Sequence, residues 1–271
     1  MTQVKERSAR WWDEKFEARC VERVAPAARL SRYNGRDGCA APGLSQTGST
    51  HINRFTTVEM IKREKIFVFA AGGHAKVVID AIEREGRYEI AWLCDGAVDK
   101  HGTHLMTYEI VHAREALLTR KAESGAGVVA IGDNGDRMKI ASWLVERGCR
   151  LAAVVHPAAA VGRDVEIGEG TVVMAGCVIN SGARVGRNVI VNTGATIDHD
   201  CEIADGVHIG PGSHLCGNVA IGSATLIGAG TTIVPTVRVG AFVLVGAGST
   251  VLADVPDRAR VGGSPCHSIG S

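Results

Sequence analysis

Residues 199 and 200 are a histidine and an aspartate, a pair of side chains suited to proton transfer. An imidazole titrates near neutral pH, so His199 could act as a general base on an attacking amine or hydroxyl. A carboxylate beside it could fix the tautomer of the ring and stabilise the imidazolium. The pair predicts base-assisted nucleophilic attack of the kind that transfers an acyl group from a thioester.

The segment that positions this pair has a period of six residues. Every sixth residue from Val161 to Val251 is Val, Ile or Leu, which makes sixteen hexads in register. The residue four positions further on is always small or Val, and a glycine often follows the aliphatic residue. A period of six excludes an α-helix and a simple alternating strand. We predict a solenoid of short parallel strands, in which the glycines allow the chain to bend sharply between faces.

Three faces of six residues would close a triangular coil of eighteen residues. Residues that are eighteen positions apart then fall into one column along the solenoid. His199 stands at a corner and points off the prism, and Gly217 lies in its column. A glycine at that position would let the backbone approach a thioester closely.

Residues 65–155 show a different pattern, in which apolar strands alternate with helices. We predict a Rossmann-like unit. Its strands are expected at 65–70, 88–94, 127–131 and 150–155, and its helices at 75–85 and 135–148. The turn Ala71-Gly72-Gly73-His74 between the first strand and helix would present backbone N–H groups to a phosphate.

The turn does not match the dinucleotide fingerprint well. The glycine template falls on Ala70, Gly72 and Ala75, and the second strand ends in Cys94-Asp95. These features favour a phosphorylated ligand other than NAD. An alternative is that the glycines only allow close packing of the helix on the sheet.

Five segments carry a more specific resemblance. They are FAAGGHAKVVIDAI, WLCDG, AIGDNGDRMKI, VVHPAA and NTGATIDHDCEIADGVHIGPGSHLCGNVAIG. They resemble the hexapeptide-repeat sugar acetyltransferases of the sialic-acid O-acetyltransferase and bacillosamine acetyltransferase type. The resemblance covers about residues 61–270. It implies a left-handed parallel β-helix that holds acetyl-CoA, after a Rossmann-like domain that holds a nucleotide-linked sugar for surface-glycan biosynthesis.

The resemblance also implies roles for individual residues. The catalytic matches are His199, Asp200 and Gly217, the last through an N–H that stabilises the oxyanion. The substrate-binding matches are Gly72, Gly73, His74, Asp95, Asn134, Arg137, Asn192 and His208. The expected acetyl-CoA contacts are Gly217, Gly228, Gly246, Gly263 and Pro265. The chain departs from the family pattern at Ala70, Cys94 and His267, where a glycine, an acid and a Lys or Arg are usual.

Composition limits the other possibilities. The net charge is +1 and no apolar run could span a bilayer, so we expect a cytoplasmic protein with no nucleic-acid or membrane partner. The eight cysteines show no paired spacing and are expected to be reduced thiols. We divide the chain into a disordered or loosely attached extension (1–59), the Rossmann-like domain (60–155) and the solenoid (156–271). A chain that starts at Met60 would then be complete.

Two alternatives to an acetyltransferase remain open from the sequence. Three histidines, His199, His208 and His214, could contribute to a zinc site shared between subunits, as in γ-type carbonic anhydrases. That interpretation leaves the Rossmann-like domain unused, and we expect no metal. The chain could also be a non-catalytic nucleotide-sugar-binding protein. A corner site open to solvent on one subunit favours a homotrimer, in which a neighbour closes the site.

Overall fold

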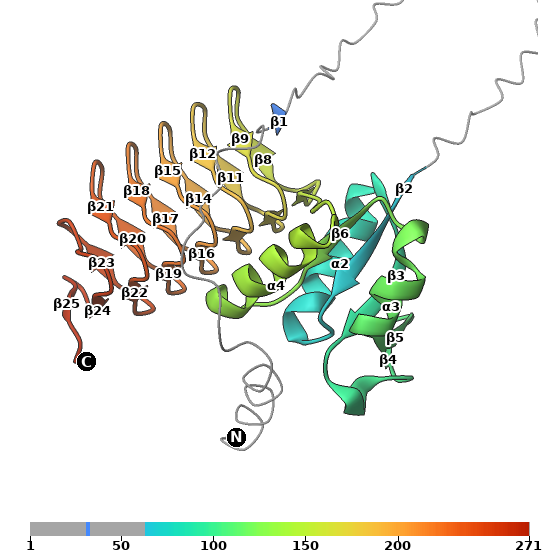
Figure 1. The fold of residues 1–271 in the computed structure, drawn as a ribbon. Coiled ribbons are helices and arrows are strands. Elements are labelled where there is room, and N and C mark those ends of the chain that lie inside the picture. The colour runs from blue at the N-terminus through green and yellow to red at the C-terminus, as the bar shows by residue number, and fades with distance from the viewer. Residues whose placement is uncertain (1–30, 33–62, 271) are drawn as a thin grey trace, which may run out of the picture.

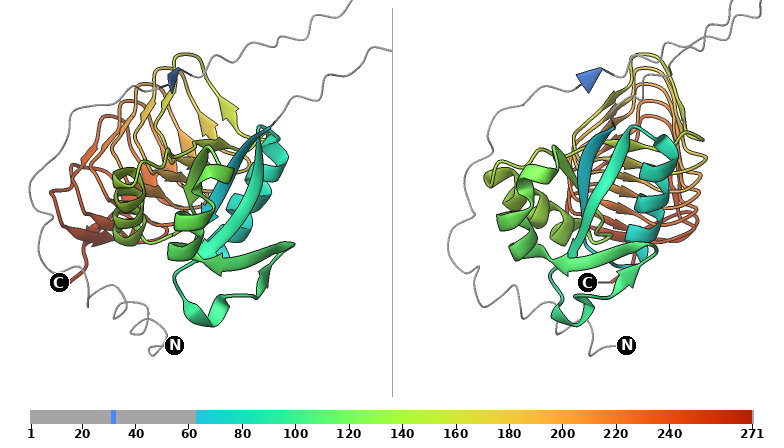
Figure 2. Two further views of the ribbon diagram at one scale, coloured as in Figure 1. Left: turned by 45° about the vertical axis from the view of Figure 1, so that its right-hand side comes forward. Right: turned by 90° about the vertical axis from the view of Figure 1, so that its right-hand side faces the viewer.

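The computed structural model describes Ser31–Arg32 and residues 63–270. An α/β domain precedes a long stack of triangular coils, and the domain packs against the first coils of the stack (Figures 1 and 2). Within the described residues the chain therefore has the two-part fold class that the sequence predicts.

The α/β domain contains a five-stranded sheet with the order β4-β5-β3-β2-β6. Its parallel strands are β2 (Glu64–Phe69), β3 (Tyr88–Asp95), β5 (Tyr108–His112) and β6 (Ala126–Val129), and β4 (His104–Leu105) is antiparallel to β5. The helices are α2 (Gly73–Glu85), α3 (Ala113–Thr119) and α4 (Asn134–Glu146), with short turns η1 (Val98–Lys100) and η2 (Lys121–Glu123).

Both faces of the sheet are buried, which explains the continuous apolar runs in β2 and β3. Ile66 and Val68 pack with α2 and with the first strands of the solenoid. Phe67 and Phe69 point to the opposite face and pack with α3 and α4, where the Phe67 ring stacks on Trp92 at 4.5 Å. Helix α2 therefore joins the core of the domain to that of the solenoid.

The predicted strand–turn–helix–strand unit is confirmed, with element ends shifted by one or two residues. Elements β4, β5 and α3 were not predicted, because in β5 only Ile110 is buried and the surrounding residues are mostly polar. The predicted strand at 150–155 is confirmed only in part, as two short pieces. Leu151 makes a single bridge to Gly127, and Val154–Val155 form β7, which is the first strand of the solenoid.

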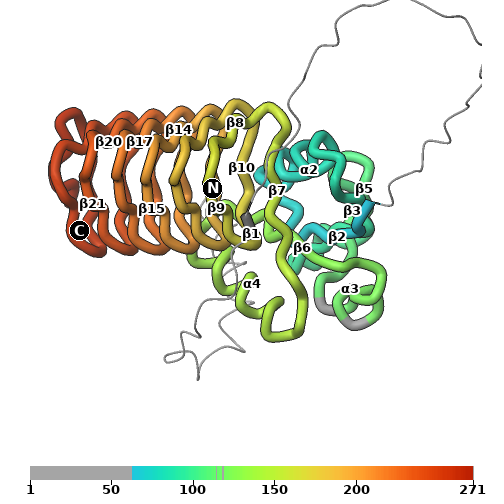
Figure 3. Tube along the Cα trace, turned by 90° about the horizontal axis from the view of Figure 1, so that it is seen from above, coloured from blue at the N-terminus to red at the C-terminus, as the bar shows by residue number. Residues whose placement is uncertain are grey.

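The solenoid has three sheets, one on each side of a triangular prism, and its coils follow one another along the stack (Figure 3). The first holds β9 (Glu166–Ile167), β12 (Arg184–Val185), β15 (Glu202–Ile203), β18 (Ala220–Ile221) and β21 (Arg238–Val239). The second holds β7 (Val154–Val155), β10 (Val172–Val173), β13 (Ile190–Val191), β16 (His208–Ile209), β19 (Leu226–Ile227), β22 (Leu244–Val245), β24 (Arg260–Gly262) and β25 (His267–Ser268). The third holds β8 (Ala160–Val161), β11 (Val178–Ile179), β14 (Thr196–Ile197), β17 (His214–Leu215), β20 (Thr232–Ile233) and β23 (Thr250–Val251). All pairs within these sheets are parallel except β24 with β25 and β1 (Ser31–Arg32) with β9.

The register confirms the eighteen-residue coil. Ile197 pairs with Leu215 and His208 pairs with Leu226, each eighteen residues apart. The aliphatic residue of each strand points inward, and the residue before it points outward. The final coil is shorter, since Leu244 pairs with Arg260.

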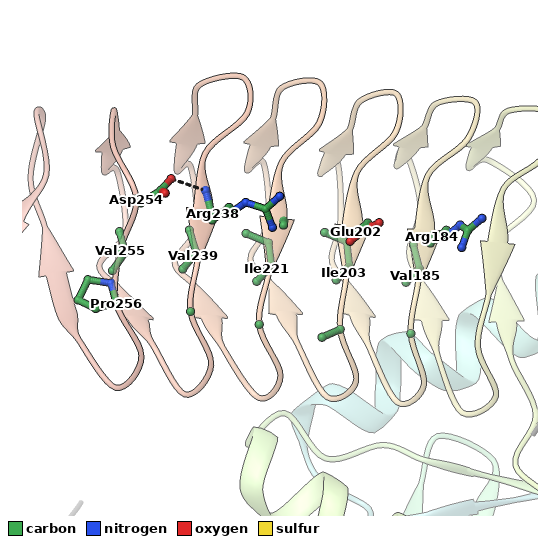
Figure 4. A pocket seen from close by; sticks show the side chains of 15 residues that line it. Arg184, Val185, Glu202, Ile203, Ile221, Arg238, Val239, Asp254, Val255 and Pro256 are labelled. Atoms are coloured by element: carbon green, nitrogen blue, oxygen red, sulfur yellow. Dashed lines mark hydrogen bonds between the residues drawn. The ribbon is translucent and has the colours of Figure 1, made fainter. Parts of the chain in front are cut away.

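The outward residues distinguish the three faces. The charged face carries Glu166, Arg184, Glu202 and Arg238 over an open groove of about 890 Å³ (Figure 4). The domain face carries Val172 and Ile190, which are buried beside the α/β domain, and then His208, Leu226 and Leu244. The threonine face carries a column without Lys, Arg, Asp or Glu, which is Ala160, Val178, Thr196, His214, Thr232 and Thr250.

The prediction of a disordered segment at 1–59 falls almost entirely outside the described residues. The described exception is β1 (Ser31–Arg32), which pairs antiparallel with β9 at the edge of the charged face.

The glycines that follow the aliphatic residues do not have the role that the sequence suggested. The residue with positive φ stands three places after each aliphatic residue, as at Gly194 (φ 68°) and Asp200 (φ 57°). A Cβ on Gly222 would instead lie 2.4 Å from the Ala241 nitrogen. Except at Gly246, these glycines are required because the backbone of the next coil passes too close for a side chain.

One pair of variants tests this close approach. Gly222→Ala should lower the free energy of unfolding by about 1–3 kcal/mol, because the new methyl group meets backbone that cannot move aside. Gly246→Ala at the same repeat position should be tolerated, since the nearest atom lies at 3.5 Å. Thermal melts compare the two variants, and equal losses of Tm would contradict this explanation.

Candidate active site

The predicted base and its carboxylate are in contact at one edge of the prism. His199 follows β14, and its Nδ1 lies 2.9 Å from Oδ2 of Asp200. Asp200 adopts the left-handed conformation that each corner of the coil requires, and aspartate tolerates that conformation. The Asp198 carboxylate accepts the His199 backbone N–H at 2.8 Å and a hydrogen bond from Asn180.

The contact with Asp200 determines what the imidazole can do. The hydrogen bond to this carboxylate, with the nearby charge of Asp198, raises the pKa of His199 above its usual value. A carboxylate at Nδ1 favours the tautomer with the proton on that nitrogen, which leaves Nε2 free to accept a proton. Both side chains are more than half exposed, so this edge is open to a substrate.

Gly217 lies directly against the ring of His199, as the column predicted. A Cβ on Gly217 would lie 2.5 Å from His199 Nε2. Only a glycine leaves room for the imidazole at this place, and the backbone of residue 217 is therefore adjacent to the atom that would take the proton.

The glycine turn of the α/β domain has the shape of an anion site. Gly72 and Gly73 are exposed at the beginning of α2, where the helix dipole is positive. Ala70, which replaces the usual first glycine, has φ 82°. The turn keeps the backbone conformation of a glycine at a residue that disfavours it.

Asp95 holds this turn in place. Its Oδ2 accepts the Ala71 N–H at 2.8 Å and the Lys100 ammonium at 2.8 Å, and its Oδ1 accepts the Ala97 N–H. These hydrogen bonds lower the pKa of Asp95 although its burial opposes the shift. Lys100 was missed by the sequence analysis, because no motif marks it, and it places a positive charge beside the turn.

Arg137 and Asn134 join the two parts of the molecule. The Arg137 guanidinium donates to the carbonyl oxygens of Asn188 and Gly206 in the solenoid, and also to Asn134 Oδ1. Its remaining N–H groups reach the carbonyls of residues 131 and 132. Asn134 donates to the Ala224 carbonyl at 3.0 Å. All five guanidinium N–H groups are therefore engaged within the protein, and the geometry assigns Arg137 a positioning role in place of direct contact with a ligand.

Three further predicted residues meet on the domain face. The His208 ring lies 6.5 Å from the ring of His74, and its Nε2 lies 3.1 Å from the Asn192 amide. Burial lowers the pKa of His74 and of His208 to about 4, and the charge of Arg137 adds to both shifts. His74 Nε2 is buried and has no hydrogen-bond partner among the described residues. With a pKa of about 4, the two imidazoles are neutral at pH 7.

The predicted site is divided between two edges of the prism. His199 and Gly217 lie where the threonine face meets the charged face. Gly217 was also predicted to contact acetyl-CoA. The other predicted acetyl-CoA contacts lie with Asn192 where the domain face meets the threonine face, and they are Gly228, Gly246, Gly263 and Pro265. One chain therefore does not bring the base and these residues together.

Two absences hold for the described residues. No group of three or more His, Cys, Asp or Glu side chains in residues 63–270 is arranged to hold a metal ion. No helix in that range is long and apolar enough to cross a membrane.

Both parts of the chain are similar to known proteins. Residues 65–144 match the family model of the PglD N-terminal domain. Residues 164–199 and 200–235 match the bacterial transferase hexapeptide model of six repeats. A variant of perosamine N-acetyltransferase from Caulobacter crescentus, solved with CoA and GDP-perosamine, is 36% identical with a TM-score of 0.72. That match covers 76% of this chain and 97% of the other.

The acetyltransferase domain of PglB from Neisseria gonorrhoeae is similar to the same extent. It is 35% identical with a TM-score of 0.71, over 76% of this chain and 100% of that domain. The same domain has been solved with acetyl coenzyme A. The chain belongs to the hexapeptide-repeat sugar acetyltransferases. Its solenoid is thus a left-handed β-helix, its co-substrate is acetyl-CoA, and the carbonic anhydrase alternative is excluded.

The buried histidines predict a loss of stability in acid. Their pKa is about 4 in the folded protein and about 6.5 in an unfolded chain, so the unfolded state binds more protons below pH 6.5. Between pH 7.5 and 5, each histidine should cost about 2 kcal/mol of unfolding free energy.

Denaturant melts at the two pH values measure this loss. His74→Gln and His208→Gln should each reduce it, whereas His104→Gln, at an exposed position, should leave it unchanged. An unchanged acid loss in the double variant would contradict the assignment.

Proposed function

We propose that this enzyme transfers the acetyl group of acetyl-CoA to an amine or hydroxyl of a nucleotide-linked sugar in surface-glycan biosynthesis. The observation that carries the proposal is the His199–Asp200 pair packed against Gly217. Acyl transfer needs an exposed base, a carboxylate that orients it and a backbone N–H group beside the base.

In this mechanism His199 Nε2 takes a proton from the sugar nucleophile as it attacks the thioester carbonyl. The Gly217 N–H stabilises the oxyanion of the tetrahedral intermediate. The C–S bond then breaks, and the imidazolium returns its proton to the departing CoA thiolate. Asp200 stabilises the imidazolium between the two steps, which agrees with the raised pKa of His199.

The α/β domain is proposed to hold the nucleotide. Gly72 and Gly73 at the start of α2 would bind the diphosphate, with Lys100 and Asp95 supporting the turn. The neutral His74 and His208 would accept or donate hydrogen bonds to the sugar. The complex of the similar Caulobacter crescentus enzyme with GDP-perosamine supports a nucleotide-linked substrate.

A homotrimer would complete the site. The base lies at one edge of the threonine face and the predicted acetyl-CoA contacts lie at the other edge. A threefold axis facing the threonine face would bring the His199 edge of each subunit against the Asn192 edge of the next. The column on the threonine face supports this packing, because it contains no Lys, Arg, Asp or Glu. Burial of the charged face would instead leave Glu and Arg side chains without solvent.

Replacement of the base tests the mechanism. His199→Ala should lower kcat by about 10² to 10⁴ with little change in CoA affinity, and Asp200→Asn should cost less. Thiol release from acetyl-CoA, with a panel of nucleotide amino sugars, follows the reaction. Near-normal turnover by His199→Ala would refute the assignment.

The shared site makes a prediction about mixed subunits. Light scattering should give three times the subunit mass. Inactive His199→Ala subunits are unfolded and refolded with an equal amount of an Asn192 variant that has low activity. In the mixed trimers, about a quarter of the sites should contain an intact His199 from one subunit and an intact Asn192 from the next. Each variant refolded alone serves as the control. An active monomer, or mixtures no more active than the separate variants, would contradict the trimer.

A further inference from the structure

Two polar residues lie in one column beside the base. Asn180 and Asp198 are eighteen residues apart, and each follows directly after the aliphatic residue of its strand, β11 or β14. The other members of this column are small or apolar, and they are Gly162, Cys216, Val234 and Leu252. The column therefore carries amide and carboxylate groups only at the coil of His199 and at the coil before it.

A hydrogen bond of defined direction joins the two side chains. The Asn180 amide donates to Asp198 Oδ1 at 2.8 Å, since an ionised carboxylate can only accept. The same oxygen accepts the His199 backbone N–H at 2.8 Å. These two hydrogen bonds lower the pKa of Asp198, so its carboxylate is charged at neutral pH. Asn180 thus fixes a charged oxygen at the main-chain N–H of the base.

The coil before the base also supports the second carboxylate. The Asp200 N–H donates to the Ser181 carbonyl at 3.3 Å. A Cβ on Gly182 would lie 2.6 Å from Asp200 Oδ1, so the Asp200 side chain rests against that coil. His199 is therefore held between two carboxylates, and both of them contact residues 180–182.

The fold does not require the contact between Asn180 and Asp198. The Asn180 side chain is exposed, and a hydrogen bond at an exposed position adds little stability, because water can replace it. Neither residue has a positive φ, so the backbone does not demand an asparagine or an aspartate there. The backbone ladder and the inward aliphatic residues hold these two coils together without the pair. A role at the base accounts for its presence.

We propose that Asn180 is a positioning residue for His199 and acts through Asp198. The inference rests on the proposed function, in which His199 is the general base. The Asn180 amide keeps the Asp198 carboxylate at the His199 main chain, where it restrains the base and adds negative charge beside the ring. Without the amide this carboxylate can turn to solvent, and both effects weaken.

Few charged groups face the imidazole. The hydrogen bond to Asp200 is the main cause of the raised pKa of His199, and the charge of Asp198 adds to it. The neighbouring coils carry no Lys, Arg, His, Asp or Glu at this corner, where their residues are Asn180, Ser181, Gly182, Cys216, Gly217 and Asn218. Arg184 and Glu202 begin the charged face beyond the edge. Loss of the Asp198 charge should therefore lower the pKa of His199, because less negative charge then stabilises the imidazolium.

The first test measures His199 directly and needs no substrate. NMR titration of the His199 ring in the full-length protein, assigned by its loss in His199→Gln, gives the titration midpoint. Asp198→Asn keeps an oxygen that accepts both hydrogen bonds but removes the charge, so the midpoint should move to lower pH by about 0.5. Asp254→Asn is the matched control and should leave the midpoint unchanged. Its carboxylate also accepts a backbone N–H on this edge, three coils further on and roughly 14 Å away.

The second test asks whether Asn180 acts through Asp198. Asn180→Ala should lower kcat about 3- to 10-fold, with the Tm and the Kd for CoA unchanged. In an Asp198→Ala background the same change should cost nothing further, because the amide has already lost its partner. Thiol release from acetyl-CoA, thermal melts and calorimetry supply these measurements.

The possible failures are distinguishable. An unmoved His199 midpoint in Asp198→Asn would overturn the proposal, and so would effects of Asn180→Ala and Asp198→Ala on kcat that simply multiply. A lower Tm in Asn180→Ala would show a structural role and would also overturn it. If the midpoint moves as expected but His199→Ala turns over normally, the proposed function fails and the contact between Asn180 and Asp198 still sets the pKa of His199.

Discussion

The backbone hydrogen bonds that stack each coil on the next, eighteen residues along the chain, are the constraint on which the rest of the structure depends. They place His199 over Gly217 and align Asn192 with Gly228 and Gly246 on another edge. Because the backbone sets these columns, the position of His199 relative to Gly217 does not depend on the packing of long side chains. The same ladder keeps the two edges of the prism apart, so in the proposed trimer a second chain supplies the other edge of the site.

Arg137 is the second interaction that organises the molecule, because it connects the rigid prism to the α/β domain. Its guanidinium bonds to carbonyls in both parts, and burial lowers its pKa only to about 10, so it stays charged. The charge also helps to keep His74 and His208 neutral. One buried cation thus bonds the two parts of the molecule together and adds to the effect of burial on the histidines at their junction.

The sequence predicted the solenoid well, because every coil repeats the same inward aliphatic residue. The register assigned to one coil is therefore checked by the next. It also predicted His199, Asp200 and Gly217 in contact, since column and register follow from the period alone. It failed where position depends on tertiary packing. Nothing local shows that Arg137 uses its donors within the protein, or that Lys100 reaches Asp95. The sequence placed the glycines of the repeat correctly, but the role predicted for them was wrong. Their role depends on the backbone of the next coil, which is not visible in one hexad.

Backbone conformation and chemistry are linked at the corners of the coil. Asp200 satisfies both demands, because aspartate tolerates positive φ and its carboxylate holds His199. Ala70 satisfies only one, since it takes positive φ with an unsuitable side chain at a predicted ligand site. Thr236 has the same strain, and nothing in the structure explains it. An unusual corner residue is therefore informative about function only when a second observation supports a role, as the hydrogen bond between Asp200 and His199 does.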